Sequence, residues 1–130
     1  MAALLPHGWS RPKGYANGVS TYGRQVFLSG MIGWDQHERF HTDDFAGQAH
    51  QALQNIVATL EAGDAKPAHI VRMTWYVTDK GEYLAALPEI GKAFRELIGH
   101  YDIAMTAVQV VALIESRAKV EIEVTAVVPD

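Results

Sequence analysis

The alternation of hydrophobic and polar residues indicates that the chain begins with sheet and then enters a long loop. Residues 19–29 (VSTYGRQVFLS) are predicted to form two short strands around Gly23 and Arg24, where glycine accepts the positive φ of a hairpin turn. Residues 30–44 follow neither a period of two nor one of 3.6. This stretch is therefore predicted to be a loop.

A helical period follows the loop. Hydrophobic residues recur three and four positions apart from Phe45 to Leu60, which predicts a helix with one apolar side. Asp43 or Asp44 can cap its N-terminus, and Gly63 can end it.

A strand and a second helix come next. Residues 69–79 (HIVRMTWYVTD) are rich in β-branched and aromatic residues, and their alternation sets two opposite faces. One face carries Val71, Met73, Trp75 and Val77, and the other carries Arg72, Thr74, Tyr76 and Thr78. Helical spacing then resumes, but Pro88 interrupts it, so we expect a short turn up to Leu87 and a main helix over 88–98.

The C-terminal part of the chain predicts two further strands, residues 104–113 and 119–127, joined by a polar turn at 115–117. The order of elements is ββαβαββ. Right-handed crossovers place both helices on the same side of the sheet, so the other side stays uncovered. Yet residues 104–113 are apolar on both faces, which is typical of a strand buried front and back.

This uncovered face predicts self-association, because a second copy of the chain is the most economical cover for an apolar sheet. We therefore expect a single α+β domain over residues 1–130, with two helices on one face of a mixed sheet, in a closed homo-oligomer.

The composition of the chain limits the classes of function that it can have. The chain has 130 residues, of which 48% are hydrophobic and 20% charged, as in ordinary globular domains. Its formal net charge of −4, without a run of Lys and Arg, argues against nucleic acid as a partner. The absence of cysteine excludes disulfides, thiolate metal sites and a cysteine nucleophile. No apolar segment reaches membrane-spanning length and no signal peptide is evident, so a soluble cytoplasmic protein without a membrane partner is the expectation.

The run HERFH at residues 37–41 spells the zinc-protease pattern H-E-x-x-H. That pattern binds metal when a helix places both histidines on one side, with a third ligand downstream. His37 and His41 instead fall in the predicted loop, and we expect no metal. The glycines at 30 and 33 are too few and wrongly spaced for a phosphate cradle, so no cofactor is expected either. Ser29 is not part of a G-x-S-x-G elbow, and a serine-hydrolase triad is not indicated.

The last strand carries the most unusual pattern. In KVEIEVTA, alternation sends Glu121, Glu123 and Thr125 to one face and three apolar residues to the other. On a solvated surface these carboxylates would be ordinary. In an oligomer interface at least one of them would be partly buried and would need a partner, for which Arg72 and Lys119 are candidates.

Several short motifs in this order resemble the RidA (YjgF) family of reactive intermediate deaminases. They are Gly14-Tyr15-Ala16, VFLSGMIGWD at 26–35, QAHQALQNIVATLEAGD at 48–64 and KVEIEVTAV at 119–127. The resemblance implies a chorismate mutase-like fold and a homotrimer with a small-molecule pocket between neighbouring subunits. It also implies hydrolysis of enamines or imines to keto acids and ammonia. Carried over by motif, Glu123 would position the water, and Tyr15, Ser29 and backbone groups would complete the pocket.

The chain departs from the family where an arginine clamps the substrate carboxylate. The family has proline, alanine, arginine and then serine or threonine, whereas this chain has Ile103, Ala104, Met105 and Thr106. A helix asparagine common in the family is replaced by Leu87. Losing a bidentate guanidinium contact weakens carboxylate binding by roughly one to two decades. The expected pocket is therefore lined by Tyr15, Ser29, Gly30, Trp34, Met105 and Thr106, with Glu123 as the catalytic residue.

Two functions remain open at this stage. The first is a deaminase that hydrolyses a less acidic, more apolar or aromatic enamine or imine in amino-acid or aromatic-amine catabolism, and that is inefficient on 2-aminoacrylate. The alternative is a non-catalytic trimer that binds or senses a small molecule in the same cleft. Ribonuclease activity, also claimed for the family, is disfavoured by the negative charge of the chain.

Overall fold

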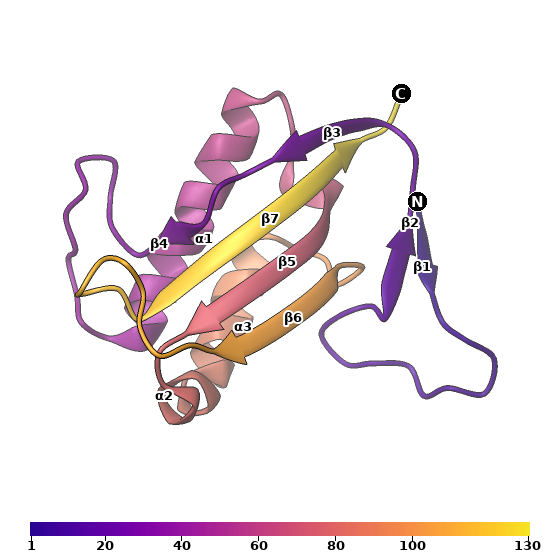
Figure 1. Ribbon diagram of the computed structural model, residues 1–130. Helices are drawn as coiled ribbons and strands as arrows, with labels where there is room; N and C mark the ends of the chain where they lie inside the picture. The colour runs from indigo at the N-terminus through magenta and orange to yellow at the C-terminus, as the bar shows by residue number, and fades with distance from the viewer.

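A mixed five-stranded sheet forms the centre of the computed structural model, which describes residues 1–130 (Figure 1). β7 (Val120–Val128) lies in the middle and pairs antiparallel with β5 (Ile70–Val77). Its other side pairs first with β3 (Arg24–Phe27) and then with β4 (Met31–Ile32). β6 (Ala104–Gln109) pairs parallel with β5 and forms the opposite edge.

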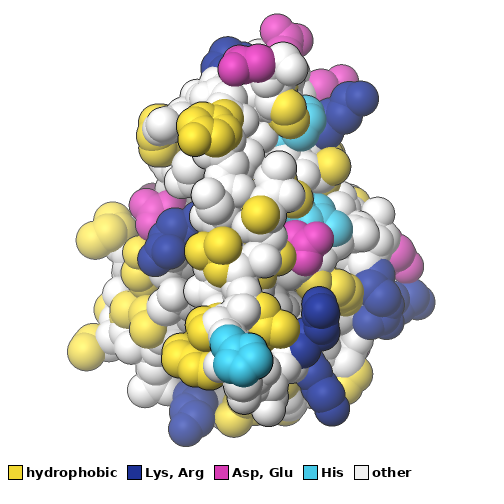
Figure 2. All heavy atoms as spheres, turned by 90° about the vertical axis from the view of Figure 1, so that its right-hand side faces the viewer, with side chains coloured by type: hydrophobic (Ala, Val, Ile, Leu, Met, Phe, Trp, Pro, Cys, Tyr) yellow, Lys and Arg dark blue, Asp and Glu magenta, His cyan; other side chains and the backbone are white.

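The N-terminal residues form a separate two-stranded ribbon. β1 (Ala2–Leu4) pairs antiparallel with β2 (Gly18–Ser20), and the ribbon stands beside the main sheet in Figure 1. The predicted hairpin around Gly23 is therefore wrong, because β2 and β3 are not paired with each other. Figure 2 views this side of the molecule, where exposed hydrophobic side chains lie among scattered charged ones.

Three α-helices, rather than the two predicted, connect the strands: α1 (Phe45–Ala62), α2 (Lys80–Ala85) and α3 (Leu87–Leu97). The stretch predicted as a short turn forms α2, because Asp79 caps it by accepting a hydrogen bond from Glu82 N. The predicted caps of α1 are confirmed, since the Asp44 carboxylate accepts a hydrogen bond from Gly47 N at 2.9 Å and Gly63 is the C-cap. Pro88 lies in the first turn of α3, where a missing N–H costs nothing. A 3₁₀ turn, η1 (Pro67–His69), precedes β5. No helix is both long and apolar enough to span a membrane.

The helices cover only one face of the sheet, as predicted. In Figure 1, α1 and α3 lie behind the strands, and the core cluster of 23 buried residues fills the space between. The alternation predicted for the last strand is confirmed: Val120, Ile122 and Val124 are buried under the helices. Glu121, Glu123 and Thr125 point to the opposite side, which we call the open face.

The open face extends onto β6 and β3. Phe27, which pairs with Thr125, is 71% exposed, and Val108, which pairs with Tyr76, is 41% exposed. The expectation that residues 104–113 form a strand buried front and back is not met within one chain. β6 ends at Gln109 and is largely exposed, because it is an edge strand. β6 and β7 are also not neighbours, since β5 lies between them.

Candidate active site

Glu123 lies on the open face and has a hydroxyl as its partner. Tyr76 Oη donates to Glu123 Oε1 across a distance of 3.2 Å. The charge of Glu123, this hydrogen bond and the neighbouring Glu121 carboxylate raise the pKa of Tyr76 above its ordinary value of 10.0. The tyrosine therefore stays protonated and remains a donor, which holds the carboxylate at a fixed place above β7 and β5.

Ser29 and Gly30 approach Glu123 from the neighbouring edge of the sheet. They form the break between β3 and β4, which is flanked by the pairs Phe27 with Thr125 and Met31 with Ile122. The break thus faces the part of β7 that contains Glu123. A Cβ on Gly30 would meet the Glu121 carboxylate, which would have to move aside.

Thr106 shares the open face with Glu123. Thr74 of β5 pairs with Glu123 on one side and with Thr106 on the other, which sets the three residues in one row across the sheet. Two strand spacings separate Thr106 from Glu123, roughly 10 Å. The structure therefore sets Thr106 and Glu123 in one row on the open face, with Gly30 beside Glu121 and Ser29 in the adjoining break between β3 and β4.

Met105 and Tyr15 lie elsewhere, in a cavity on the helix side of the sheet. Met105 pairs with Met73 of the core and packs against the core cluster. Tyr15 reaches the same place because Ala16 forms a bridge to Ala104 and donates from its N–H to Ile103 O at 2.9 Å. The cavity has a volume of about 400 Å³ and opens beside the edge strand β6.

One chain therefore divides the predicted site residues between two separate places, which we call half-sites. Met105 and Thr106 are adjacent in an extended strand, so their side chains point to opposite faces. Thr106 shares the open face with Glu123, whereas Met105 faces the cavity under the helices. No single chain can place Met105 and Glu123 against the same small molecule.

The cavity is more aromatic than the sequence motifs revealed. Trp75 from β5, Tyr83 from α2, Phe94 from α3 and Tyr101 line it together with Tyr15. Burial raises the pKa of Tyr83, which therefore stays neutral. The position of Trp75 followed from strand alternation, but the other rings come from distant segments whose packing the sequence did not indicate. Leu87, at the start of α3, also lines the cavity.

Trp34 lies apart from both half-sites. It forms a bridge with Phe40 across the loop after β4, with ring centroids 5.9 Å apart. Arg117 sits over the Phe40 ring at 5.3 Å from its centroid. Within one chain, the structure therefore does not bring Trp34 to Glu123 or to Met105.

The HERFH segment lies in a loop, as predicted, and the loop is held together by Asp35. Its carboxylate accepts hydrogen bonds from His37 N at 2.8 Å and Arg39 N at 3.1 Å, and lies 2.6 Å from His41 Nε2. The hydrogen bond with His41, aided by the two backbone N–H groups, lowers the pKa of Asp35 to about 2. His41 thus helps to hold this loop in its conformation.

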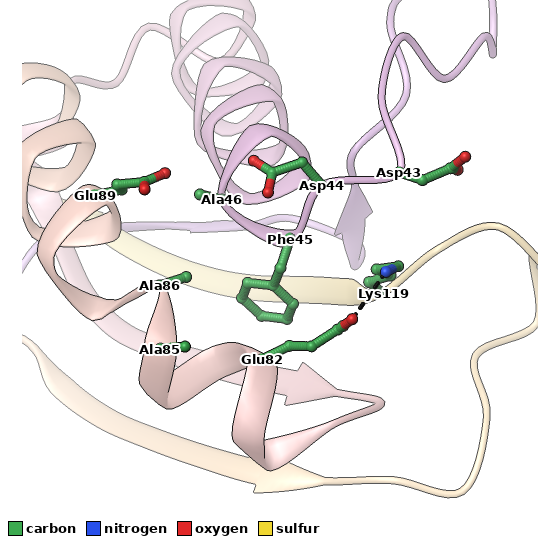
Figure 3. Close-up of a pocket in the computed structure, with 9 residues that line it drawn as sticks. All are labelled: Asp43, Asp44, Phe45, Ala46, Glu82, Ala85, Ala86, Glu89 and Lys119. Atoms are coloured by element: carbon green, nitrogen blue, oxygen red, sulfur yellow. Dashed lines mark hydrogen bonds and ion pairs between the residues drawn. The ribbon is translucent and has the colours of Figure 1, made fainter.

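Neither cation proposed as a partner of Glu123 pairs with it. Lys119 Nζ lies 3.0 Å from Glu82 Oε1 instead, and Arg72 forms no ion pair within 4.0 Å. Figure 3 shows Lys119 and Glu82 in a second hollow between the starts of α1 and α2. Two of the acidic groups in this hollow have structural roles: Asp44 caps α1, and Asp43 forms an ion pair with Arg117 at 2.9 Å.

These features define an α+β protein with an uncovered sheet face and a separate aromatic cavity. The uncovered face carries a glutamate that accepts a hydrogen bond from a tyrosine hydroxyl. A family model described as Endoribonuclease L-PSP matches residues 10–128. The chain belongs to this family, that of the RidA/YjgF proteins, as the sequence motifs predicted.

Named relatives agree with this assignment. The 2-iminobutanoate/2-iminopropanoate deaminase of Salmonella typhimurium is 32% identical over 113 residues, which are 87% of this chain and 86% of that protein. Protein DfrA of Myxococcus xanthus is 32% identical over 132 aligned positions, which cover 98% of this chain and 97% of that protein.

Solved structures show the same fold. The Rid-family protein YyfB of Yersinia pestis superposes with a TM-score of 0.86 at 26% identity, over 98% of each chain. E. coli TdcF, solved with bound serine, has a TM-score of 0.68 at 31% identity, over 93% of this chain and 91% of that one.

Proposed function

We propose that the protein is a deaminase that hydrolyses an enamine or imine, in a homotrimer whose sites lie between subunits. The observation that carries this proposal is the separation of the two half-sites on opposite faces of one sheet. A neighbouring copy that covers the open face brings its own cavity edge, with Met105 and Tyr15, toward Glu123. The apolar Phe27 and Val108 on the open face favour such a cover.

The chemistry follows from the carboxylate. Glu123 takes a proton from a water molecule while the oxygen of that water forms a bond to the carbon of the C=N group. The proton passes to the nitrogen, which gives a carbinolamine. Transfer of the hydroxyl proton to the nitrogen then lets the C–N bond break, and the products are a carbonyl compound and ammonia. Tyr76 holds the carboxylate through its hydroxyl, and backbone N–H groups near Thr106 stabilise the charge that develops on the substrate. The relative from Salmonella typhimurium is named for deamination of imino acids, which supports this reaction class.

The substrate preferred here is more apolar than a short imino acid. Met105 and Leu87 contribute no charge to the cavity, and Lys13 is the one charged residue among those that line it. TdcF binds serine, a small carboxylate, whereas a carboxylate entering this cavity meets mostly aromatic and aliphatic walls. Such walls favour an apolar or aromatic imine.

The assembly itself provides the first test. Sedimentation equilibrium is expected to give about three times the 14.3 kDa of one chain at micromolar concentration. A stable monomer under these conditions would leave the two half-sites apart and would refute the proposed site. Phe27→Arg, which places a charge on the open face, is expected to weaken the assembly, and Tyr22→Arg, on a side chain that is 92% exposed and precedes β3, serves as its control.

Restoring the missing cation gives a second prediction. Met105→Arg is expected to raise deamination of 2-aminoacrylate by roughly one to two decades over the poor wild-type rate, because a guanidinium can clamp the substrate carboxylate. Ammonia release from 2-aminoacrylate generated in situ measures the effect. Met105→Gln, of similar length but uncharged, is the matched control and should bring no gain. Efficient turnover of this substrate by the wild-type protein would contradict our interpretation of the cavity.

The alternative is a binding trimer without catalysis. It is favoured by the same cavity, which can hold an apolar molecule whether or not Glu123 acts on it. A thermal-shift screen with product analysis separates the two functions, since a pure binder raises the melting temperature without consuming its ligand. Ribonuclease activity, which the family description names, finds no support in the charge of the chain or in the two glutamates of the open face.

A further inference from the structure

The open face of the sheet carries one cation that has no partner in the chain. Arg72 of β5 is exposed and forms no ion pair within 4.0 Å. It lies on the open face because it pairs with Thr125, whose side chain points to that side. Among the strand residues of the open face, Arg72 is the only Lys or Arg, whereas Glu121 and Glu123 are both acidic. Its guanidinium is therefore available to an anion from outside the chain.

Arg72 is also a close neighbour of Glu123. Thr74, two residues further along β5, pairs with Glu123, so Arg72 lies diagonally across from the carboxylate. Diagonal neighbours of this kind on one face of a sheet lie roughly 7–8 Å apart, within reach of long side chains. Tyr76 is influenced by both charges, since Glu123 raises the pKa of its hydroxyl most and Arg72 opposes this rise. One small molecule above β5 and β7 can therefore contact both Arg72 and Glu123.

Covering the open face makes a partner for Arg72 necessary. In the proposed trimer a neighbouring copy displaces water from the guanidinium, and a cation left there without an anion costs free energy. The cavity edge of that neighbour supplies no anion, because no carboxylate lines the cavity and Lys13 is its one charged residue. A ligand that carries an anion supplies the missing charge.

We propose that Arg72 binds the carboxylate of the substrate, and that the substrate is an α-imino acid with a large apolar side chain. The carboxylate is bonded directly to the C=N carbon, so anchoring it at Arg72 places that carbon beside Glu123. The apolar side chain then enters the aromatic cavity of the neighbouring copy. Arg72 is thus a specificity-determining residue. The inference rests on the assembly of the proposed function, but binding does not require that Glu123 be catalytic.

This mode of binding disfavours short imino acids. 2-Aminoacrylate has the carboxylate but lacks a side chain that could fill a cavity of about 400 Å³, so it forgoes the apolar contacts. Met105→Arg adds a cation on the cavity side, where so small a substrate can bind by its carboxylate alone.

Two ligands of nearly equal size test the anion site without turnover. 3-Phenylpropanoate carries a carboxylate, and 3-phenylpropanamide is its neutral counterpart. In the wild-type protein, calorimetry is expected to show about tenfold tighter binding of the carboxylate, and this preference should shrink as salt is raised. Arg72→Gln keeps a polar side chain without the charge and should abolish the preference. Arg39→Gln removes an exposed arginine in the loop after β4 and should leave the preference unchanged.

The other candidate cation is Lys13 in the cavity wall. Loss of the preference in Lys13→Gln and its retention in Arg72→Gln would place the anion in the cavity and overturn the inference. Equal affinities of the wild-type protein for the two ligands would also overturn it. Sedimentation checks that the variants assemble. If Arg72→Gln does not, Arg72→Lys keeps the charge but loses the bidentate fork, and an unchanged preference in that variant would count against Arg72.

Kinetics separate this inference from the proposed function. With 3-phenyl-2-iminopropanoate, generated from phenylalanine by an amino-acid oxidase, Arg72→Gln is expected to raise KM about tenfold and to lower kcat much less. A carboxylate preference that depends on Arg72 in a protein without turnover would support the anion site and refute the deaminase proposal. Turnover that depends on Glu123, without any carboxylate preference, would do the reverse.

Discussion

Glu123→Gln is expected to lower turnover of any imine that the wild-type protein hydrolyses by about two to four decades, the range found for a lost general base. The amide keeps the size of the side chain but accepts no proton from water. Tyr76 can still donate to the amide oxygen, so the fold should be unchanged. Steady-state ammonia release measures the effect, and circular dichroism confirms folding.

Glu121→Gln is the matched control, because it makes the same change of charge two residues away on the same face. It should keep the turnover within a few-fold of the wild type. Equal losses in both variants would indicate that the face needs negative charge in general rather than one positioned carboxylate, and an active Glu123→Gln would refute the role of Glu123.

Mixing two inactive variants tests whether the half-sites come from different copies. Leu87→Asp places a carboxylate at the cavity, on a side chain that is 42% exposed and at a helix start where a negative charge is favourable. Co-assembly of Glu123→Gln with Leu87→Asp should restore activity at about one site in four, because each interface of a closed ring joins one copy's face to the next copy's cavity. No recovery in a mixed trimer would mean that each site lies within one copy.

The local elements were predictable because their causes are local. The Asp44 cap, the hydrophobic spacing of α1 and the alternation of β7 depend on neighbouring residues, and all three are confirmed. The partner of β2 was not predictable, because it is a three-residue strand at the start of the chain that is too short to show a period. The strand order could not be predicted for a related reason, since nothing in residues 104–127 indicates that β5 lies between β6 and β7.

The sequence allowed candidate site residues to be named, but it did not give their arrangement. Alternation alone already separates Met105 from Thr106, since adjacent residues of a strand point to opposite faces. Placing Glu123 with Thr106 rather than with Met105 required the register through Thr74, which depends on the packing of three strands. The aromatic cavity required the docking of α2 and α3 onto β5, which links residues far apart in the sequence.

Gln48 holds the loop before α1 against the segment just before the start of β7. It is fully buried in α1, and its side chain makes three hydrogen bonds to backbone groups. Nε2 donates to Thr42 O at 3.1 Å and to Arg117 O at 3.0 Å, and Oε1 accepts from Lys119 N at 2.8 Å. The amide thus ties the loop before α1 to the segment that leads into β7.

Gln48→Leu is expected to lower the free energy of unfolding by about 2–4 kcal/mol, because it leaves a backbone donor and two carbonyl groups without partners inside the protein. The new side chain also cannot relax outward: the backbone of Gly33 packs so closely that a Cβ there would lie 2.5 Å from the Cβ of Gln48. Urea unfolding at a fixed protein concentration measures the change, since assembly adds to the apparent stability.

Gln54→Leu is the control, because it makes the same substitution on the exposed side of the same helix, where the side chain makes no hydrogen bond with the chain. It should change the stability by less than about 0.5 kcal/mol. Since the Gln48 amide fixes Lys119 at the start of β7, Gln48→Leu should also loosen the strand that presents Glu123, and turnover should fall with stability. A Gln48→Leu protein as stable as Gln54→Leu would show that the three backbone groups find other partners, and that the position of β7 does not depend on this amide.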